Sequence, residues 1–94
     1  MAIAAVFEFP SEPVEKYHKV FEAGEVIVNQ PDRIHHVCYR TGTGFTVIDV
    51  WADERSFAAF GEILGPAVQH VGLDAKPVVY PVEQYLTRDG NRGS

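Results

Sequence analysis

The sequence predicts a single α+β domain whose elements follow the order strand, helix, strand, strand, helix, strand. Its 94 residues are enough for one hydrophobic core and too few for two. Apolar residues recur with strand-like or helix-like periods, and two β-prone runs flank a glycine-rich turn at residues 41–44. Right-handed crossovers turn this order into a four-stranded antiparallel sheet with both helices on one face, the split βαβ arrangement.

The first strand and the first helix are predicted over residues 2–9 and 12–24. The strand is rich in apolar and aromatic residues, and Pro10 ends its hydrogen-bond ladder because proline has no backbone N–H. Ser11 is placed to cap the helix and Gly24 to end it. The apolar residues of this segment have helical spacing: Val14, Tyr17, Val20 and Phe21.

The middle of the chain predicts a β-hairpin. Residues 25–33, which contain a turn-forming cluster, are interpreted as a connection. Strands follow over residues 34–40 and 45–51, and the glycines at 42 and 44 are expected to supply the positive φ of a tight turn. A loop with an even number of residues pairs Arg40 with Phe45, Cys38 with Val47, His36 with Asp49, and Ile34 with Trp51. A three-residue loop would shift the register and separate these pairs.

The second helix is predicted to open at Asp53 or Ser56. We expect the Gly65 and Pro66 pair to interrupt it, so that a short further helix follows. The apolar residues keep helical spacing on both sides of the break: Phe57, Phe60, Leu64, Ala67, Val68 and Val71.

The last strand is predicted over residues 76–86. Pro77 and Pro81 favour an edge position in the sheet, or pairing with another subunit on one side, because neither offers a ladder donor. Residues 87–94 are polar and are expected to be disordered. The expected organisation is therefore one domain over residues 1–86 followed by a polar tail.

Composition excludes several classes of partner. Eight basic residues against thirteen acidic ones give a net charge of −5, which repels phosphate backbones, so we expect no nucleic acid partner. No apolar stretch reaches the roughly 20 residues of a membrane span, so no membrane partner is expected. The single cysteine, Cys38, and the scattered histidines predict no disulfide and no metal site. A cytoplasmic location is the default expectation.

Both faces of the predicted sheet need cover, since apolar side chains occupy both parities of the strands. In this respect the sequence resembles the dimeric α+β barrel superfamily, and within it the small proteins related to antibiotic-biosynthesis monooxygenases. The residues that carry the resemblance are 2–10, 36–37, 47–51, Phe57, Phe60, 80–82 and 85–86.

The resemblance implies a ferredoxin-like fold, a homodimer with two sheets packed face to face, and a pocket in each subunit for a small hydrophobic or aromatic ligand. Known activities of the superfamily include cofactor-free oxidation of phenols or quinols, haem degradation, lactone isomerisation and stress-response roles. The first strand here lacks the Asn that haem-degrading members use, which argues against that activity. Of the groups used by polyketide-oxidising members, only the residue types of Trp51, Arg40 and Tyr80 can be matched.

The candidate catalytic pair is His36 and Asp49. Opposed side chains on neighbouring strands have Cβ atoms about 4.5 to 5.5 Å apart, so Asp49 can orient the imidazole and favour its uptake of a proton. His36 is then a candidate general base, with Trp51 stacking on a substrate ring and Arg40 holding the anion that develops. The competing interpretation is that the pair only satisfies two partly buried polar groups.

Two other candidate residues, Glu8 and Tyr80, have open roles at this stage. Glu8 lies at the cavity mouth if Ala2 and Ala4 mark the cavity face, or else is an exposed carboxylate. Tyr80 is either a pocket hydroxyl or a dimer contact. His35 faces away from His36, so the two neighbours cannot chelate one metal.

The expected function is that of a cofactor-independent monooxygenase acting on a small aromatic, quinol or polyketide-like compound. The alternatives are a non-catalytic ligand-binding or stress-response protein, and an isomerase or lyase in which His36 or Glu8 only transfers protons. Composition alone does not separate an enzyme from a binding protein on this scaffold.

Overall fold

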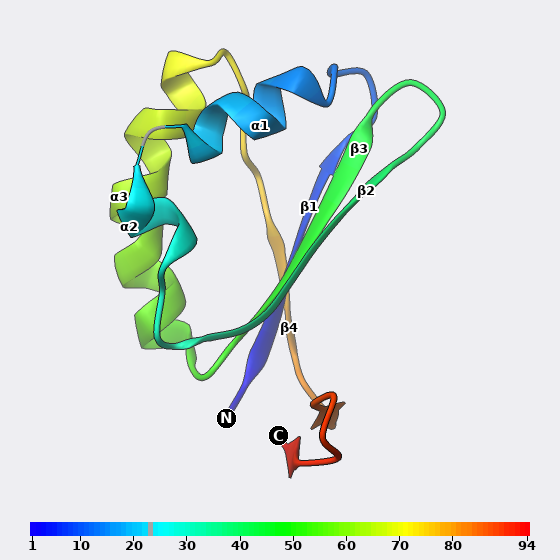
Figure 1. The fold of residues 1–94 in the computed structure, drawn as a ribbon, viewed down its shortest axis with the longest axis vertical. Helices are drawn as coiled ribbons and strands as arrows, with labels where there is room; N and C mark the ends of the chain where they lie inside the picture. Colours follow the sequence, from blue (N-terminus) through cyan, green and yellow to red (C-terminus); the bar gives the residue numbers. More distant parts are fainter. Residues whose placement is uncertain (23) are drawn as a thin grey trace.

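A computed structural model describes residues 1–22 and 24–94, and it has two layers, a sheet and a group of helices. The strands are β1 (Ile3–Phe9), β2 (Arg33–Arg40), β3 (Phe45–Trp51) and β4 (Val78–Pro81). They form an antiparallel sheet in the order β2-β3-β1-β4. The helices are α1 (Glu15–Phe21), α2 (Glu25–Val28) and α3 (Glu54–His70). All of them lie on one side of the sheet (Figure 1), which confirms the predicted α+β, ferredoxin-like fold.

The core lies between the sheet and the helices, and strand alternation builds it. In β1 the residues of one parity, Ile3, Ala5, Phe7 and Phe9, are all buried beneath the helices. Trp51 at the end of β3 is fully buried and packs on Phe60 of α3, with ring centroids 4.9 Å apart. The helices therefore cover the face that also carries the odd-numbered residues of β3.

The first helix is shorter than predicted. It begins at Glu15 rather than at residue 12 and ends at Phe21, and Val14 at its N-cap provides no side-chain hydrogen bond. Of the residues predicted to be helical beyond it, Ala23 lies outside the described residues. Residues 25–28, interpreted from sequence as a connection, form the single-turn helix α2, which buries Ile27 in the core. Burial of one apolar residue outweighs the weak local propensity of so short a segment.

The predicted break in the second helix is wrong. α3 runs unbroken through Pro66, and Asp53 caps it by accepting a hydrogen bond from the backbone N–H of Ser56 at 2.7 Å. A proline inside a helix costs about 3 kcal/mol or more. Phe60 before it and Val68 after it are both buried against the core, and this packing offsets the cost.

The hairpin has the even loop on which the predicted register depends. The backbone N–H of Thr41 donates to the carbonyl of Gly44 at 2.9 Å, and His36 lies opposite Asp49. Neither glycine of this loop has a positive φ, contrary to expectation. Gly44 is required for another reason, because a Cβ there would collide with the carbonyl oxygen of Phe9.

The predicted pairing of Ile34 with Trp51 is also wrong. The register shifts between Arg33 and His35, so that Arg33 pairs with Trp51 and Ile34 is the extra residue of a bulge. A bulge of this kind changes which side chain points to which face of the sheet. Here it turns Arg33 toward the helices.

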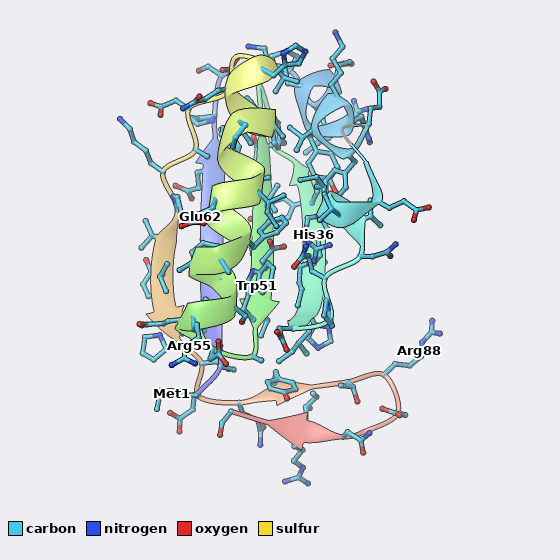
Figure 2. All side chains as sticks on the ribbon, turned by 90° about the vertical axis from the view of Figure 1, so that its left-hand side faces the viewer. Met1, His36, Trp51, Arg55, Glu62 and Arg88 are labelled. Atoms are coloured by element: carbon cyan, nitrogen blue, oxygen red, sulfur yellow. The ribbon has the colours of Figure 1, made fainter. Side chains whose placement is uncertain are left out.

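The chain ends differently from expectation. β4 covers only residues 78–81, at the edge of the sheet as the prolines indicated. β5 (Tyr85–Leu86), predicted as the end of the last strand, instead pairs with β6 (Arg92–Gly93) of the predicted disordered tail, and the two form a separate two-stranded ladder. A hydrogen bond from the backbone N–H of Thr87 to the carbonyl of Asn91, 2.8 Å long, closes the turn between them. Figure 2 shows this ladder beyond the end of the main sheet.

The second face of the sheet is apolar and uncovered in the single chain. Large side chains of the edge strands are about half exposed on it: Val37 and Tyr39 of β2, and Val78 and Tyr80 of β4. None of the helices in the described part of the chain combines the length and the apolar composition needed to cross a lipid bilayer.

Candidate functional site

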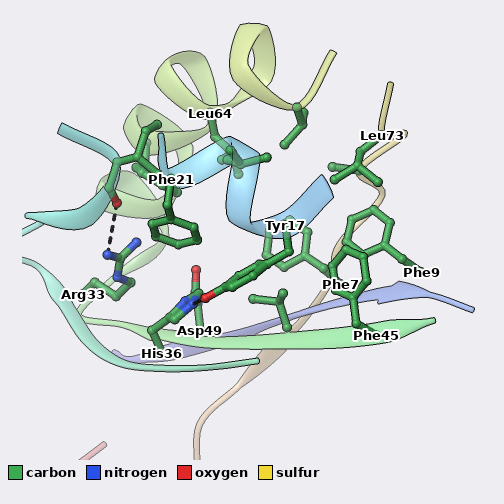
Figure 3. A pocket seen from close by; sticks show the side chains of 16 residues that line it. Phe7, Phe9, Tyr17, Phe21, Arg33, His36, Phe45, Asp49, Leu64 and Leu73 are labelled. Carbon is green, nitrogen blue, oxygen red and sulfur yellow. Dashed lines mark hydrogen bonds and ion pairs between the residues drawn. The ribbon is translucent and has the colours of Figure 1, made fainter. Parts of the chain in front are cut away.

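Three side chains from three elements form a hydrogen-bonded row on the helix-covered face of the sheet. His36 of β2 hydrogen-bonds through Nδ1 to Oδ1 of Asp49 on β3. The other ring nitrogen, Nε2, lies 2.7 Å from the hydroxyl of Tyr17 on α1. Figure 3 shows the three side chains in sequence, with the Tyr17 ring next to the imidazole. The hairpin positions the pair, and α1 adds the tyrosine.

Burial and charge determine where the protons lie. Asp49 is only 3% exposed, and its carboxylate can only accept a hydrogen bond, so Nδ1 of His36 carries the hydrogen. In the neutral imidazole Nε2 is then the acceptor, and the hydroxyl of Tyr17 donates to it. Burial, together with the nearby Cys38 and Asp49, raises the pKa of Tyr17, while Arg33 opposes the rise. The tyrosine therefore stays a neutral donor near neutral pH.

The row borders an internal cavity of about 50 Å³. Most of its lining is apolar, with aromatic residues from the sheet and aliphatic residues from the helices, among them Phe7, Phe9, Phe45, Val20, Leu64 and Val68. Its polar side chains are Tyr17, Arg33, His36 and Asp49, and Figure 3 shows them gathered at one end. The surface of the cavity is therefore apolar, with the four polar side chains in its lining at one end, and the cavity is much smaller than a typical small-molecule site of roughly 300 Å³ or more.

Arg33, like Tyr17, lies at this end of the cavity and was not identified as a site residue from the sequence. Its Nη2 donates to the carbonyl oxygens of Ile27 at 3.1 Å and Val28 at 2.6 Å, which are at the end of α2. Its guanidinium carbon lies 5.7 Å from the ring centroid of Trp51 and 5.5 Å from that of Phe60. These contacts hold a cation beside His36 and Asp49.

The other predicted site residues do not join the cavity. Trp51 lies in the core behind the cavity wall rather than on it. Arg40 is exposed at the end of β2, beside a surface groove with Val14 and His18. Glu8 and Tyr80 lie on the uncovered face, because their parity in β1 and β4 is opposite to that of the buried residues. Of the six, only His36 and Asp49 are brought together at the cavity.

The remaining histidines and the cysteine lie outside this row. His35 is directed away from His36 and its ring meets the edge of Tyr85, with centroids 6.1 Å apart. His18 and His70 are exposed on their helices. Burial raises the pKa of the Cys38 thiol, which favours the unreactive protonated form. Across residues 1–22 and 24–94, no three His, Cys, Asp or Glu side chains are grouped closely enough to hold a metal ion.

Solved structures with this fold include oxygenases. A protein from Shewanella loihica PV-4, provisionally described as a monooxygenase, is 19% identical, with a TM-score of 0.60 over 86% of this chain and 93% of its own. A variant of SnoaB, a cofactor-independent oxygenase from Streptomyces nogalater, is 20% identical to this chain. Its TM-score is 0.59, and the match covers 90% of this chain and 94% of the SnoaB chain. The monooxygenase of the ActVA-Orf6 gene of Streptomyces coelicolor, solved with Nanaomycin D, is 18% identical, with a TM-score of 0.56 over 92% and 90%.

These similarities define the class of fold. No family model matches the sequence, and no curated protein matches it. At identities of 20% or below, the similarity establishes a shared ferredoxin-like α+β fold and leaves the chemistry to be argued from the site.

Proposed function

We propose that this protein is a cofactor-independent monooxygenase acting on a small aromatic phenol or quinol, or a polyketide-like compound. The observation that carries the proposal is the position of His36 in the lining of an apolar cavity, where Nδ1 is bound to the buried Asp49 and Nε2 lies 2.7 Å from the hydroxyl of Tyr17. A histidine held in this way is suited to accept a proton from a substrate hydroxyl. The fold shared with oxygenases of known structure supports the choice of reaction.

The proposed reaction converts a phenol and O₂ into a quinone and water. His36 takes the hydroxyl proton, and the phenolate gives one electron to O₂. The two radicals combine in a C–O bond at the ring carbon ortho or para to the oxygen, and His36 returns its proton to the peroxide. The O–O bond of this hydroperoxide then breaks. Its terminal oxygen leaves as hydroxide and combines with the proton of the ring C–H to form water, while the oxygen bound to the ring remains as a new carbonyl. All four electrons accepted by O₂ come from the substrate, so the balance needs no other reductant.

Asp49 and Arg33 have separate roles in this proposal. Asp49 orients the imidazole and stabilises its cationic form after proton uptake. Arg33 lies at the same end of the cavity and stabilises the phenolate by its charge, the role that the sequence suggested for Arg40. The phenylalanines of the lining hold the ring and exclude water.

A homodimer is part of the proposal. The apolar face that carries Val37, Tyr39, Val78 and Tyr80 is half exposed in the single chain, and burial of this face against a second copy removes it from water. In the barrel so formed, Tyr80 is an interface residue and Glu8 lies near the same face. The single cysteine, which has no second cysteine in the sequence with which to form an internal disulfide, supports a reducing, cytoplasmic location.

Oxygen uptake with a panel of hydroxynaphthalenes and quinols tests the function. We expect saturable uptake by the unmodified protein and a loss of about 10²-fold or more in His36→Gln, as for removal of a general base. His70→Gln is the matched control, since His70 is exposed at the end of α3. Conversion of a ligand without oxygen uptake would indicate an isomerase or lyase, and binding without conversion would indicate a binding protein; either result overturns the proposal.

A further inference from the structure

We propose that Tyr17 occupies the place of the substrate's hydroxyl-bearing ring in the unliganded protein, and that a hydroxyaromatic ligand must displace it from His36. The inference rests on the proposed function for the identity of the site and adds the chemical class that the site selects: a planar ring with a free hydroxyl. It also assigns α1 as the element that moves.

The first argument is geometric. The Tyr17 hydroxyl lies 2.7 Å from Nε2 of His36, the position that a substrate hydroxyl must take to give up its proton there. The two rings are nearly parallel, with an interplanar angle of 11° and centroids 5.9 Å apart. Phe21 and Phe45 contact the tyrosine ring, with centroids 4.9 Å and 6.0 Å away. Tyr17 is thus a phenol bound in an aromatic site next to the candidate base.

The second argument is volume. The cavity measures about 50 Å³, whereas a dry cavity that accepts benzene measures roughly 150 Å³. An aromatic substrate therefore does not fit while the lining stays as it is. Tyr17 is part of that lining, and withdrawal of its side chain would both enlarge the cavity and uncover Nε2 of His36.

The third argument is the weak attachment of α1. The helix has 7 residues and no side-chain cap at its N-terminus, and helices shorter than about 12 residues are marginal on their own. Val20 is its one buried residue, and Tyr17 and Phe21 pack against the core while remaining partly exposed. At the surface, Lys16 joins it to the carbonyl of Gly72 at 3.3 Å and to Glu12 at 2.9 Å, both solvent-accessible contacts of small energy. A segment held in this way can move at low cost.

The neutral state of Tyr17 suits a residue that occupies the position of a substrate hydroxyl. Burial is the main cause of its raised pKa, so Tyr17 remains a neutral hydroxyl donor in this contact near neutral pH. A quinol or naphthol that replaces it places its own hydroxyl in the same position. The bond to His36 is then exchanged for an equivalent one, whereas a ring without a hydroxyl leaves Nε2 unpaired.

Anaerobic calorimetric titration with 1-naphthol and with naphthalene tests the inference in the absence of turnover. Tyr17→Phe keeps the ring and removes the competing hydroxyl, so we expect it to bind 1-naphthol about threefold to tenfold more tightly than the unmodified protein. Tyr85→Phe, outside the main sheet, is the matched control and should leave the affinity unchanged. We also expect both the unmodified protein and the Tyr17→Phe variant to prefer 1-naphthol over naphthalene.

Weaker binding by Tyr17→Phe would show that Tyr17 contacts the ligand rather than competing with it, and unchanged binding would show that it does not move; either result overturns the inference. Absence of 1-naphthol binding to both proteins overturns it as well.

A second variant, Tyr17→Ala, leaves a space for a phenol, and p-cresol should raise its melting temperature more than toluene does. Tighter binding to Tyr17→Phe without oxygen uptake in any assay would refute the proposed function while leaving the displacement of Tyr17 intact.

Discussion

His36 and Asp49 lie directly opposite each other on β2 and β3, and their side chains are hydrogen-bonded on the face of the sheet that the helices cover. The carboxylate is buried, whereas about a quarter of the histidine side chain remains exposed. A buried acceptor on one nitrogen fixes the tautomer and leaves the other nitrogen to exchange protons. This pairing is the basis of the chemistry that we propose.

Replacement of Asp49 by Asn tests the role of its charge. We expect at least a tenfold lower kcat for oxygen uptake, because an amide cannot stabilise the imidazolium and can favour the wrong tautomer. Asp32→Asn is the control, since Asp32 is an exposed residue between α2 and β2. Steady-state kinetics with a hydroxynaphthalene give the answer, and an unchanged kcat in Asp49→Asn would show that the pair is only structural.

Arg33→Ala is expected to reduce kcat/KM by about tenfold or more, because it removes the cation at the polar end of the cavity. Arg33→Lys should recover little, since a lysine cannot reproduce the planar contacts with Trp51 and Phe60 or the two bonds to α2. Arg40→Ala is the control and should behave like the unmodified protein. A larger loss in Arg40→Ala than in Arg33→Ala would restore the assignment made from the sequence.

The two glycines of the hairpin loop should differ sharply in their tolerance of a side chain. Gly44→Ala places a Cβ against the backbone of Phe9 and Pro10, and we expect a loss of about 2 kcal/mol or more in the free energy of unfolding. At Gly42 nothing lies within 4 Å of an added Cβ, so Gly42→Ala should have little effect. Urea unfolding measures both. Equal stabilities would contradict the close approach of this loop to the end of β1.

A charge on the uncovered face of the sheet should prevent dimer formation. Val37 and Val28 are 53% and 49% exposed, but only Val37 belongs to the proposed interface. We expect sedimentation to show a dimer at micromolar concentration for the unmodified protein and for Val28→Glu, and a monomer for Val37→Glu. A monomer in all three would refute the barrel arrangement.

The pairing of His36 with Asp49 could be predicted from the sequence, because this pairing depends only on strand alternation and on the length of the hairpin loop. Once the hairpin loop has an even length, His36 and Asp49 must share a face. Of the two alternatives for Glu8, the structure confirms the exposed carboxylate, because Ile3 and Ala5 face the helices and Glu8 has the opposite parity. The correct parity requires knowledge of which face the helices cover.

Two of the four polar residues at the cavity could not be predicted from local pattern. Arg33 reaches the cavity through a bulge at Ile34, and a bulge has no marker in this stretch of sequence. Tyr17 fits the apolar stripe of a helix, and its bond to His36 depends on how α1 lies across the sheet. Pro66 shows the same limitation, because tertiary packing keeps α3 continuous where local rules predict a break.

The most direct test of the central claim is turnover under isotopically labelled dioxygen, with the product quinone analysed by mass spectrometry. If His36 initiates oxygen insertion, the quinone gains one labelled atom per turnover, the other labelled atom appears in water, and His36→Gln slows both by about 10²-fold or more. A quinone that carries no label, or labelling that is as fast in His36→Gln as in the unmodified protein, would contradict the account.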